Sequence, residues 1–459
     1  MGNIAIAMKV GADEIIHTVS TDAPSRGARF LRFLGPGFLV SVGYMDPGNW
    51  ATDLEGGSRF GYTLLWVILA SNLMAILLQT LCVRLGLGGG MDLAQACKAI
   101  FNRPLSVLLW LLAEIAMIAT DVAEVIGSAV ALNLLFGLNK VAGVVLTGLD
   151  VILLLGLMKF GFRKLEALVI VLVGTIGVCL FINVFKAAPA WGSVASSLIP
   201  REKPSGDALR IAIGIIGATV MPHNLYLHSS IVQSRQVPED RKHEAIKAAT
   251  WDTVISLGAA FFVNAAILIL AAAVFHKGGT PVASLERAHE LLTPTLGPVA
   301  AVLFGVALLA SGQSSTITGT LAGQVVMEGF MNWKIKPQFR RMITRGLALV
   351  PAILIVTLTE GRDIDGLVLS QVILSLQLPF AVFPLVLIAA NKAKLGEYAA
   401  PKWMTVLGVL IGTVITLLNI NFMADKFGWP LIVGGAAALA GFVYWSQFVY
   451  RAKDRVVAD

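Results

Sequence analysis

The chain consists largely of twelve long apolar runs that are separated by short polar breaks. Each run is close to the ~20 residues that an α-helix needs to cross a hydrocarbon core about 30 Å thick. Helices are expected because unpaired backbone groups are costly in lipid, and because the runs lack the alternating pattern of a membrane barrel. The sequence therefore predicts an all-α integral membrane protein with about twelve transmembrane spans. The runs lie approximately at residues 34–56, 63–85, 105–136, 141–158, 165–186, 208–233, 251–275, 297–329, 342–359, 365–390, 404–423 and 428–450.

Charged residues are scarce and unevenly placed along the chain. Asp, Glu, Lys and Arg make up 14% of it, whereas soluble domains contain about 25%. The net charge of +7 does not indicate nucleic-acid binding, because most Lys and Arg residues fall in alternate loops, as expected of basic loops that stay in the cytoplasm. Residues 1–33 lack an apolar stretch long enough for a signal peptide. We therefore expect cytosolic tails at residues 1–33 and 451–459.

Two of the twelve runs contain residues that a continuous helix avoids. The first run is interrupted at residues 44–49 (YMDPGN) and the sixth at residues 218–223 (ATVMPH). Proline removes a backbone donor and frees groups that are tolerated at membrane depth only where they line a cavity or bind something. Each break alone fits an ordinary proline kink. A matched pair five spans apart, however, predicts an inverted repeat with a binding site between the two broken helices.

The side chains at these breaks indicate a cation as the ligand. Asp46 supplies a carboxylate, Asn49 an amide oxygen and Met221 a thioether, and the second break is expected to expose the Ala218 carbonyl. A carboxylate at mid-membrane favours a cationic partner or a proton without deciding which. A thioether suits first-row transition ions better than Ca²⁺ or Mg²⁺, although methionine is also common apolar filler.

The two break motifs, DPGN at residues 46–49 and MPH at residues 221–223, resemble the signatures of the Nramp family of proton-coupled divalent metal transporters for manganese and iron. The likeness covers about residues 30–425. Further segments resemble those of the family in the family order: GGSRFGYTL at 56–64, ATDVAEVIG at 119–127, GIIGATVMPHNLYLHS at 214–229, LLASGQSST at 308–316 and SQVILSLQLPF at 370–380.

The resemblance implies a LeuT-type fold, with an inverted repeat of five plus five helices followed by two C-terminal helices. The first repeat then occupies residues 34–190, the inverted second repeat residues 207–390 and the two C-terminal helices residues 403–450. The resemblance also implies a metal-ligand set. That set consists of Asp46, Asn49, Met221, the Ala218 carbonyl and, in one conformational state, Gln371. Related magnesium transporters lack the methionine, so its presence favours Mn²⁺ and Fe²⁺.

Three acids in the third run form a second candidate site. One face of this helix carries all three: Glu114, Asp121 and Glu124. Three carboxylates that face lipid would be very costly, so this side of the helix is expected to face protein or water. Arg340 and Arg341 at the start of the ninth run are natural partners. The resemblance identifies this group as a proton path from the metal site to the cytoplasm. A structural salt-bridge cluster is the alternative.

Two histidines follow the second break. His223 and His228 are five residues apart and so lie about 140° apart on a helix, a poor spacing for joint chelation of a metal. The resemblance implies gating and proton handling for both, and Asp46 joins them on the proton route. The polar residues Asp150 and Asn264 stay without an assigned role.

Membrane enzymes are not indicated, because neither H-E-x-x-H nor G-x-S-x-G nor a Gly-rich nucleotide loop lies on these helices. We expect instead a secondary active transporter that imports Mn²⁺, Fe²⁺, Cd²⁺ and similar ions together with protons by alternating access. It would need no cofactor and no obligatory protein partner, and would lie in the bacterial inner membrane with both termini in the cytoplasm. A divalent cation channel and a sodium-coupled amino-acid carrier of the same fold type remain alternatives.

Overall fold

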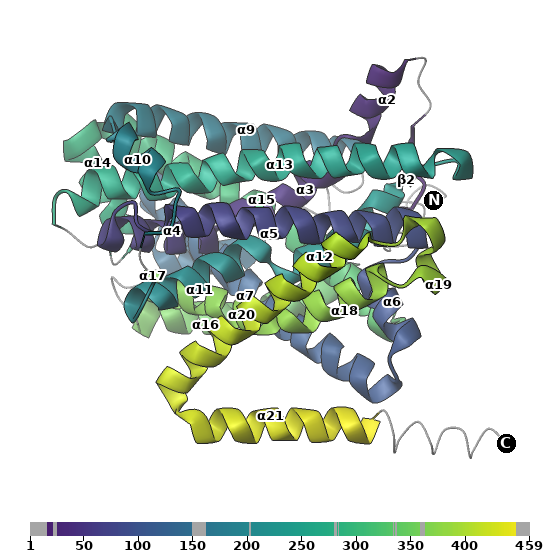
Figure 1. The fold of residues 1–459 in the computed structure, drawn as a ribbon. Coiled ribbons are helices and arrows are strands. Elements are labelled where there is room, and N and C mark those ends of the chain that lie inside the picture. The colour runs from purple at the N-terminus through teal and green to yellow at the C-terminus, as the bar shows by residue number, and fades with distance from the viewer. Residues whose placement is uncertain are drawn as a thin grey trace, which may run out of the picture.

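Helices account for almost all of the protein's secondary structure (Figure 1). The structure is a computed structural model, which describes residues 16–21, 25–148, 162–201, 203–279, 282, 284–333, 335, 337–358 and 363–446. Eight described helices are long and apolar enough to cross a membrane, and three shorter apolar helices accompany them. Together they correspond to every predicted run except the fourth, of which residues 149–158 lie outside the described residues.

The elements of the first half are β1 (Val19–Ser20), α2 (Arg26–Phe33), α3 (Pro36–Ser41), η1 (Gly43–Met45), α4 (Pro47–Phe60), α5 (Leu65–Val83), η2 (Arg84–Gly88), α6 (Leu93–Ile100), α7 (Arg103–Phe136), α9 (Phe162–Ala187) and α10 (Trp191–Ser196). The second half contains α11 (Asp207–Val220), α12 (Pro222–Ile231), η3 (Val232–Ser234), β2 (Arg235–Gln236), η4 (Glu239–Arg241), α13 (Lys242–Ala271), η5 (Ala272–His276), α14 (Leu285–Leu296), α15 (Pro298–Met331), α16 (Pro337–Leu358), α17 (Asp363–Gln377) and α18 (Pro379–Ala389). The C-terminal part consists of α19 (Lys392–Leu395), η6 (Gly396–Tyr398), α20 (Lys402–Phe427) and α21 (Trp429–Tyr444). The strands β1 and β2 pair in parallel over two residues each.

The two broken helices lie in the interior of the bundle. In the first, α3 ends at Ser41, the short η1 follows, and α4 begins at Pro47. Asp252 on α13 fixes the start of α3, because its carboxylate accepts hydrogen bonds from the backbone N–H groups of Gly35 (3.3 Å) and Gly37 (2.7 Å). In the second, α11 ends at Val220 and α12 begins at Pro222. Both predicted breaks are thus confirmed at the backbone.

A proline that the sequence analysis did not single out divides the tenth span into two helical segments. The helix α17 ends at Gln377 and α18 begins at Pro379. Leu378 lies between them, and its N–H donates to the carbonyls of both Leu374 and Ser375. The run 365–390 is therefore a single span whose helix is interrupted at one residue, because Leu378 keeps helical backbone angles (φ −49°, ψ −45°).

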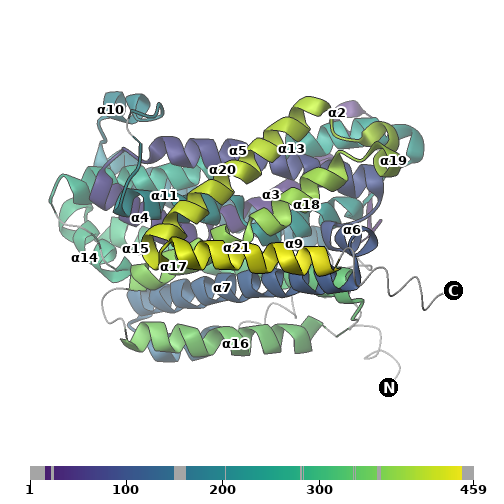
Figure 2. The same ribbon diagram turned by 60° about the horizontal axis from the view of Figure 1, so that its bottom comes forward.

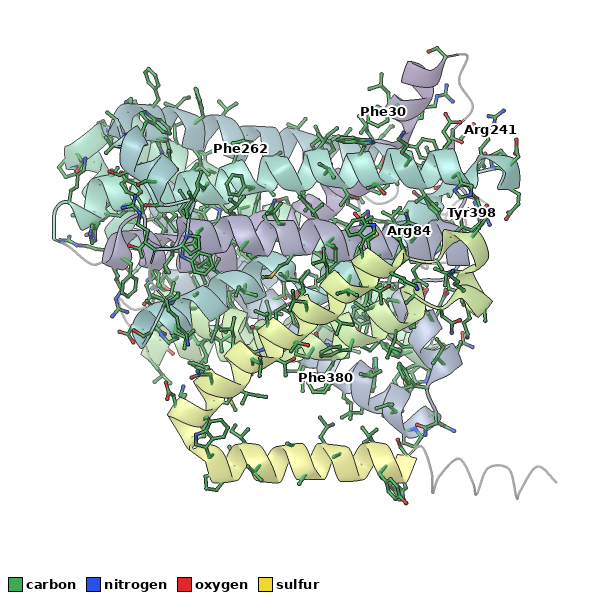
Figure 3. The ribbon with its side chains drawn as sticks, in the orientation of Figure 1. Phe30, Arg84, Arg241, Phe262, Phe380 and Tyr398 are labelled. Carbon is green, nitrogen blue, oxygen red and sulfur yellow. The ribbon has the colours of Figure 1, made fainter. Side chains whose placement is uncertain are left out.

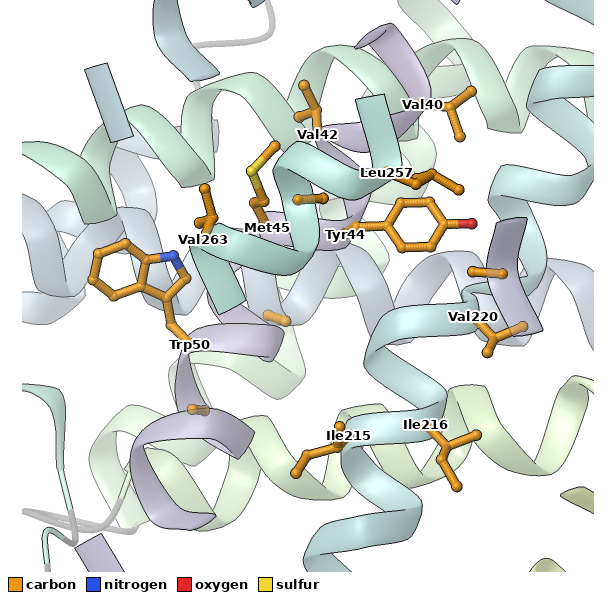
Figure 4. Packing of buried hydrophobic residues seen from close by; sticks show 14 of the residues in the cluster. Val40, Val42, Tyr44, Met45, Trp50, Ile215, Ile216, Val220, Leu257 and Val263 are labelled. Carbon is orange, nitrogen blue, oxygen red and sulfur yellow. The ribbon is translucent and has the colours of Figure 1, made fainter. Parts of the chain in front are cut away.

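Apolar side chains fill the space around the first break. Val42, Tyr44 and Met45 pack with Leu257 and Val263 of α13 (Figure 4). The Trp50 ring meets Phe304 of α15 edge to face, with 5.2 Å between ring centroids. The polar groups of the break are consequently buried: Asp46 and Asn49 are at most 1% exposed.

The outer surface of the bundle has the character expected of a lipid-facing protein. Phe262 on α13, for example, is 72% exposed (Figure 3). The last helix, α21, contains no buried residue and lies along the edge of the bundle (Figures 1 and 2). Arg84, Arg241 and Tyr398 lie at one end of the bundle, together with Phe30 of α2 (Figure 3). The described part of the protein is therefore a multi-pass membrane protein.

Candidate cation site and charged network

Asp46 is held in place by the helix that begins directly after it. Its backbone is extended (φ −68°, ψ 166°), and its carboxylate caps α4 by accepting a hydrogen bond from the Asn49 N–H at 2.8 Å. Asp is among the best residues for this N-cap position, and proline is preferred at the first helical position that follows. The local sequence Asp-Pro-Gly-Asn thus positions a carboxylate at a helix N-terminus in the middle of the membrane.

Asn49 connects the two broken helices. Its side-chain Nδ2 donates to Oδ1 of Asp46 at 2.8 Å and to the Ala218 carbonyl at 3.1 Å. Asn264 of α13 donates from its Nδ2 to the Tyr44 carbonyl at 2.7 Å and to Oδ1 of Asn49 at 3.3 Å. Three of the five predicted ligands therefore meet in one hydrogen-bonded group, and Asn264, which had no assigned role, supports it.

Met221 forms the second break itself. Its φ of +21° is unusual for a residue with a side chain, and such a conformation costs on the order of 1–3 kcal/mol unless the surroundings impose it. The side chain is fully buried, and its sulfur accepts a hydrogen bond from Nδ2 of Asn224 at 3.7 Å. A strained backbone at this point is typical of a functional site.

Gln371 lies on α17 against both breaks. A Cβ added at Gly48 would clash with the Gln371 amide, and one added at Gly217 would clash with its backbone carbonyl. These two glycines let α17 approach α4 and α11 closely, and in this way the fifth predicted ligand comes next to the residues that follow Asp46.

Several buried polar atoms in this group have no hydrogen-bond partner. Oδ2 of Asp46, Oε1 of Gln371 and Oγ1 of Thr219 are all of this kind. Such atoms are rare in native proteins because leaving them unsatisfied is costly. Each of these three residues therefore keeps an oxygen available to a ligand.

The donor set itself limits which metal chemistry is possible. Among the described residues, no group of three or more His, Cys, Asp or Glu side chains is placed to hold a metal ion. The site instead offers one carboxylate, neutral oxygens and a thioether. A closed structural zinc site uses four strong ligands, so this set fits an ion that is bound and released.

The acids of α7 face α16, as predicted, and an arginine that was not predicted is among their partners. Arg340 donates from Nη2 to Glu114 at 3.1 Å. Arg345, which the sequence analysis did not select, lies 3.3 Å from Oε2 of Glu124 and 4.0 Å from Oδ1 of Asp121. Nη1 of Arg345 is the nitrogen in both of these distances. Its Nη2 donates a hydrogen bond to Oγ1 of Thr316 at 3.3 Å. Arg341 lies on the same helix, but its side chain is outside the described part.

Arg345 was not predicted as a partner, because it stands within the ninth apolar run rather than at its start. Its spacing of four residues from Arg341 could have indicated it, because side chains four residues apart lie on the same face of a helix. The side chains of Asp121, Glu124 and Arg345 are at most 3% exposed. None of them faces lipid.

The two histidines of α12 contact different helices. Nδ1 of His223 lies 3.4 Å from Oγ1 of Thr120 on α7. Nδ1 of His228 lies 2.9 Å from Oε1 of Gln79 on α5, and Nε2 of that glutamine donates to the Tyr44 hydroxyl at 2.8 Å. His223 is thus next to the acids of α7, whereas His228 connects through Gln79 to η1. Sequence reasoning did not identify Gln79, whose position depends on how α5 packs against α12.

An apolar cavity of about 280 Å³ lies between α7, α16 and α17. Its wall includes Ser370, the neighbour of Gln371, but its lining is otherwise apolar. It offers no ligands to a cation and is separate from the site described above.

Solved structures with low sequence identity share this fold. The chain superimposes on a nucleobase-cation-symport-1 family transporter in a closed conformation with a TM-score of 0.57, 16% identity and coverage of 86% of this chain and 93% of the other. For MhsT in complex with L-phenylalanine the TM-score is 0.59 at 14% identity, with 83% and 98% covered. Together with the interrupted helices, these superpositions define the fold as the LeuT type, an inverted repeat of five plus five helices.

Closer relatives identify the family. Residues 37–425 match the family described as Nramp, natural resistance-associated macrophage protein-like. A divalent metal cation transporter MntH from Agrobacterium fabrum is 55% identical over 408 residues, which cover 87% of this chain and 88% of that protein. An MntH from Nostoc is 53% identical over 413 residues, covering 88% and 93%. A crystal structure of the Eremococcus coleocola manganese transporter has a TM-score of 0.88 at 38% identity, with 97% and 100% covered. The chain belongs to the Nramp family, whose members are transporters rather than enzymes.

Proposed function

We propose that this protein imports divalent transition metal ions, Mn²⁺ and Fe²⁺ first among them and also Cd²⁺, across the bacterial inner membrane. The observation that carries the proposal is the group formed by Asp46, Asn49 and the Ala218 carbonyl at the junction of two broken helices. Relatives with more than half of their residues identical are named divalent metal cation transporters. Metal transport is therefore the function that both the chemistry of the site and the relatives support.

The metal ion takes the place that the Asn49 amide nitrogen now occupies between two oxygens. A rotation of the Asn49 side chain brings its oxygen toward the ion and gives up the hydrogen bonds that its amide now makes with Asp46, the Ala218 carbonyl and Asn264. Asp46, Asn49, Ala218 and Gln371 then supply oxygens and Met221 a sulfur. The thioether disfavours Ca²⁺ and Mg²⁺, which bind oxygen ligands almost exclusively.

Proton co-transport completes the proposal. His223 contacts Thr120 of α7, one residue before Asp121, and Asp121 leads to Arg345 and Glu124. This line of titratable and charged groups extends from the metal site through buried parts of the protein. Alternating access would rest on movement at the breaks of spans 1 and 6. The tails are cytoplasmic in this proposal, and neither a cofactor nor an obligatory protein partner is needed.

A sodium-coupled amino-acid carrier is the second candidate, because MhsT shares the fold and binds L-phenylalanine. Such a site would be expected to direct helix N-termini toward the substrate carboxylate. Asp46 occupies the N-terminus of α4 with a carboxylate of its own. This acid favours a cation over an amino acid.

Uptake of Mn²⁺ into proteoliposomes at increasing external concentration tests the proposal. A carrier gives a rate that saturates with Mn²⁺, and Mg²⁺ and Ca²⁺ compete poorly. A rate that rises linearly over the same range would indicate a channel instead. Uptake that requires Na⁺ and an amino acid would support the second candidate and overturn the proposal.

A further inference from the structure

A second buried carboxylate stands on the same helix as the candidate metal site. Asp53 of α4 is 1% exposed, and its Oδ2 has no hydrogen-bond partner. Within the described part of the chain, no Lys, Arg or His nitrogen lies within 4 Å of it. Its neighbour Glu55 is different, because Arg59 and Arg210 bind that side chain at 2.8 Å and 2.7 Å.

Asp53 is aligned with the residues of the site. Residues 46, 49 and 53 follow the i, i+3, i+7 spacing and so share one face of α4. Seven residues of helix place Asp53 about 10 Å beyond Asp46 along the axis. The helix α4 packs against α11, α13 and α17, the helices that carry Ala218, Asn264 and Gln371.

Asp53 lies on the outer side of Asp46 in the proposed orientation. Beyond it, α4 continues to Arg59, whose guanidinium binds Asp207 at the start of α11. This is the end of the bundle opposite α2 (Figure 1), and in the proposed orientation it faces the outside. An ion that enters from this end would meet Asp53 before it reaches Asp46.

A buried carboxylate without a counter-charge is costly in a membrane-spanning helix and marks an ion or proton pathway. We infer that Asp53 is an outer contact for the incoming divalent cation, which it holds through a carboxylate oxygen before the ion passes to Asp46. The inference rests on the proposed function and deepens it. Because Asp53 offers oxygen alone, it takes a partly hydrated ion and does not distinguish Mn²⁺ from softer Cd²⁺. Discrimination between these ions belongs to Met221.

The test compares Asp53→Asn with the unchanged protein in initial rates of uptake. In cells that present the outer face, the KM of Asp53→Asn for Mn²⁺ should rise about tenfold. This is the lower end of the gain in association rate that a charged cleft gives to an ion of opposite charge. The KM for Cd²⁺ should rise by the same factor, and the maximal rate should stay near that of the unchanged protein. In inside-out vesicles, where the ion arrives from the other face, the KM should not change.

Asp207→Asn provides the control. It removes an exposed acid at the same end of the bundle, and its KM should stay within about twofold, because exposed charges are screened by solvent and salt. If Asp53→Asn does not elute as a single folded species, Asp53→Ser is measured by the same criteria.

Three results would overturn the inference. An unchanged KM in folded Asp53→Asn would mean that Asp53 is a buried neutral acid without contact to the ion. A lower maximal rate with an unchanged KM would assign it to a conformational step. A change in KM from both faces would contradict an outer position. If the unchanged protein shows no saturable Mn²⁺ uptake at all, the proposed function fails instead, and with it this inference.

Discussion

Arg345 provides a quantitative test of the charged network between α7 and α16. Its guanidinium lies 3.3 Å from Glu124, and the two side chains are 2% and 0% exposed. Removing one partner of a buried ion pair costs about 3–5 kcal/mol, because the other charge stays in a medium that solvates it poorly. Arg345→Gln should therefore lower the free energy of unfolding by about 3 kcal/mol, with a clear fall in the thermal midpoint in detergent.

A double-mutant cycle separates the ion pair from other effects of the substitution. Glu124→Gln combined with Arg345→Gln removes both charges. The double variant should therefore lose about 2 kcal/mol less free energy of unfolding than the two single variants lose in sum. Arg241→Gln is the matched control: this arginine is partly exposed and lies 4.0 Å from Asp240, so its loss should cost at most about 1 kcal/mol. Strictly additive losses in the cycle would refute a direct Arg345–Glu124 interaction.

Three further substitutions test the site and the proposed proton route. Asp46→Ala should leave a folded protein whose Mn²⁺ uptake is near background, because the site then contains no carboxylate; uptake above half of the original rate would remove Asp46 from the metal site. Glu124→Gln should weaken metal-driven acidification more than Mn²⁺ binding, and lower Mn²⁺ affinity with unchanged acidification would contradict a proton role. Met221→Ala should preserve most Mn²⁺ transport, lower the affinity for Cd²⁺ most and allow Ca²⁺ to compete. A Met221→Ala protein as indifferent to excess Ca²⁺ as the original would show that cavity size or ligand number sets the selectivity.

The breaks of spans 1 and 6 could be predicted because proline stands there beside polar residues. Proline alone is a weaker signal, since Pro351 and Pro384 lie inside helices that continue past them. Pro379 was not singled out, although Gln377 stands two residues before it. Leu378 between them keeps helical backbone angles (φ −49°, ψ −45°), so this proline interrupts the helix for one residue only. Whether a proline ends a helix depends on the groups that bind the freed carbonyls, and these come from other helices.

The candidate site also combines residues that the sequence predicts with residues that only helix packing brings together. Asp46 and Asn49 lie close in sequence, and capping explains their geometry, so the sequence was sufficient for them. Asn264 and Gln79 join the site only through the packing of α13 against η1 and of α5 against α12. Arg345 is similar, because its partner Glu124 belongs to a helix from a much earlier part of the chain. Single-sequence reasoning has no access to contacts over such separations.

The most direct test of metal–proton co-transport is metal-dependent acidification of proteoliposomes that contain the purified protein and an internal pH indicator. Mn²⁺ and Fe²⁺ added outside should each acidify the interior at a rate that saturates with metal, and Mg²⁺ should have almost no effect. The Asp46→Ala protein should give no signal with any ion. Saturable Mn²⁺ entry without any change in internal pH would contradict proton coupling, and equal acidification by Mg²⁺ would contradict the role assigned to Met221.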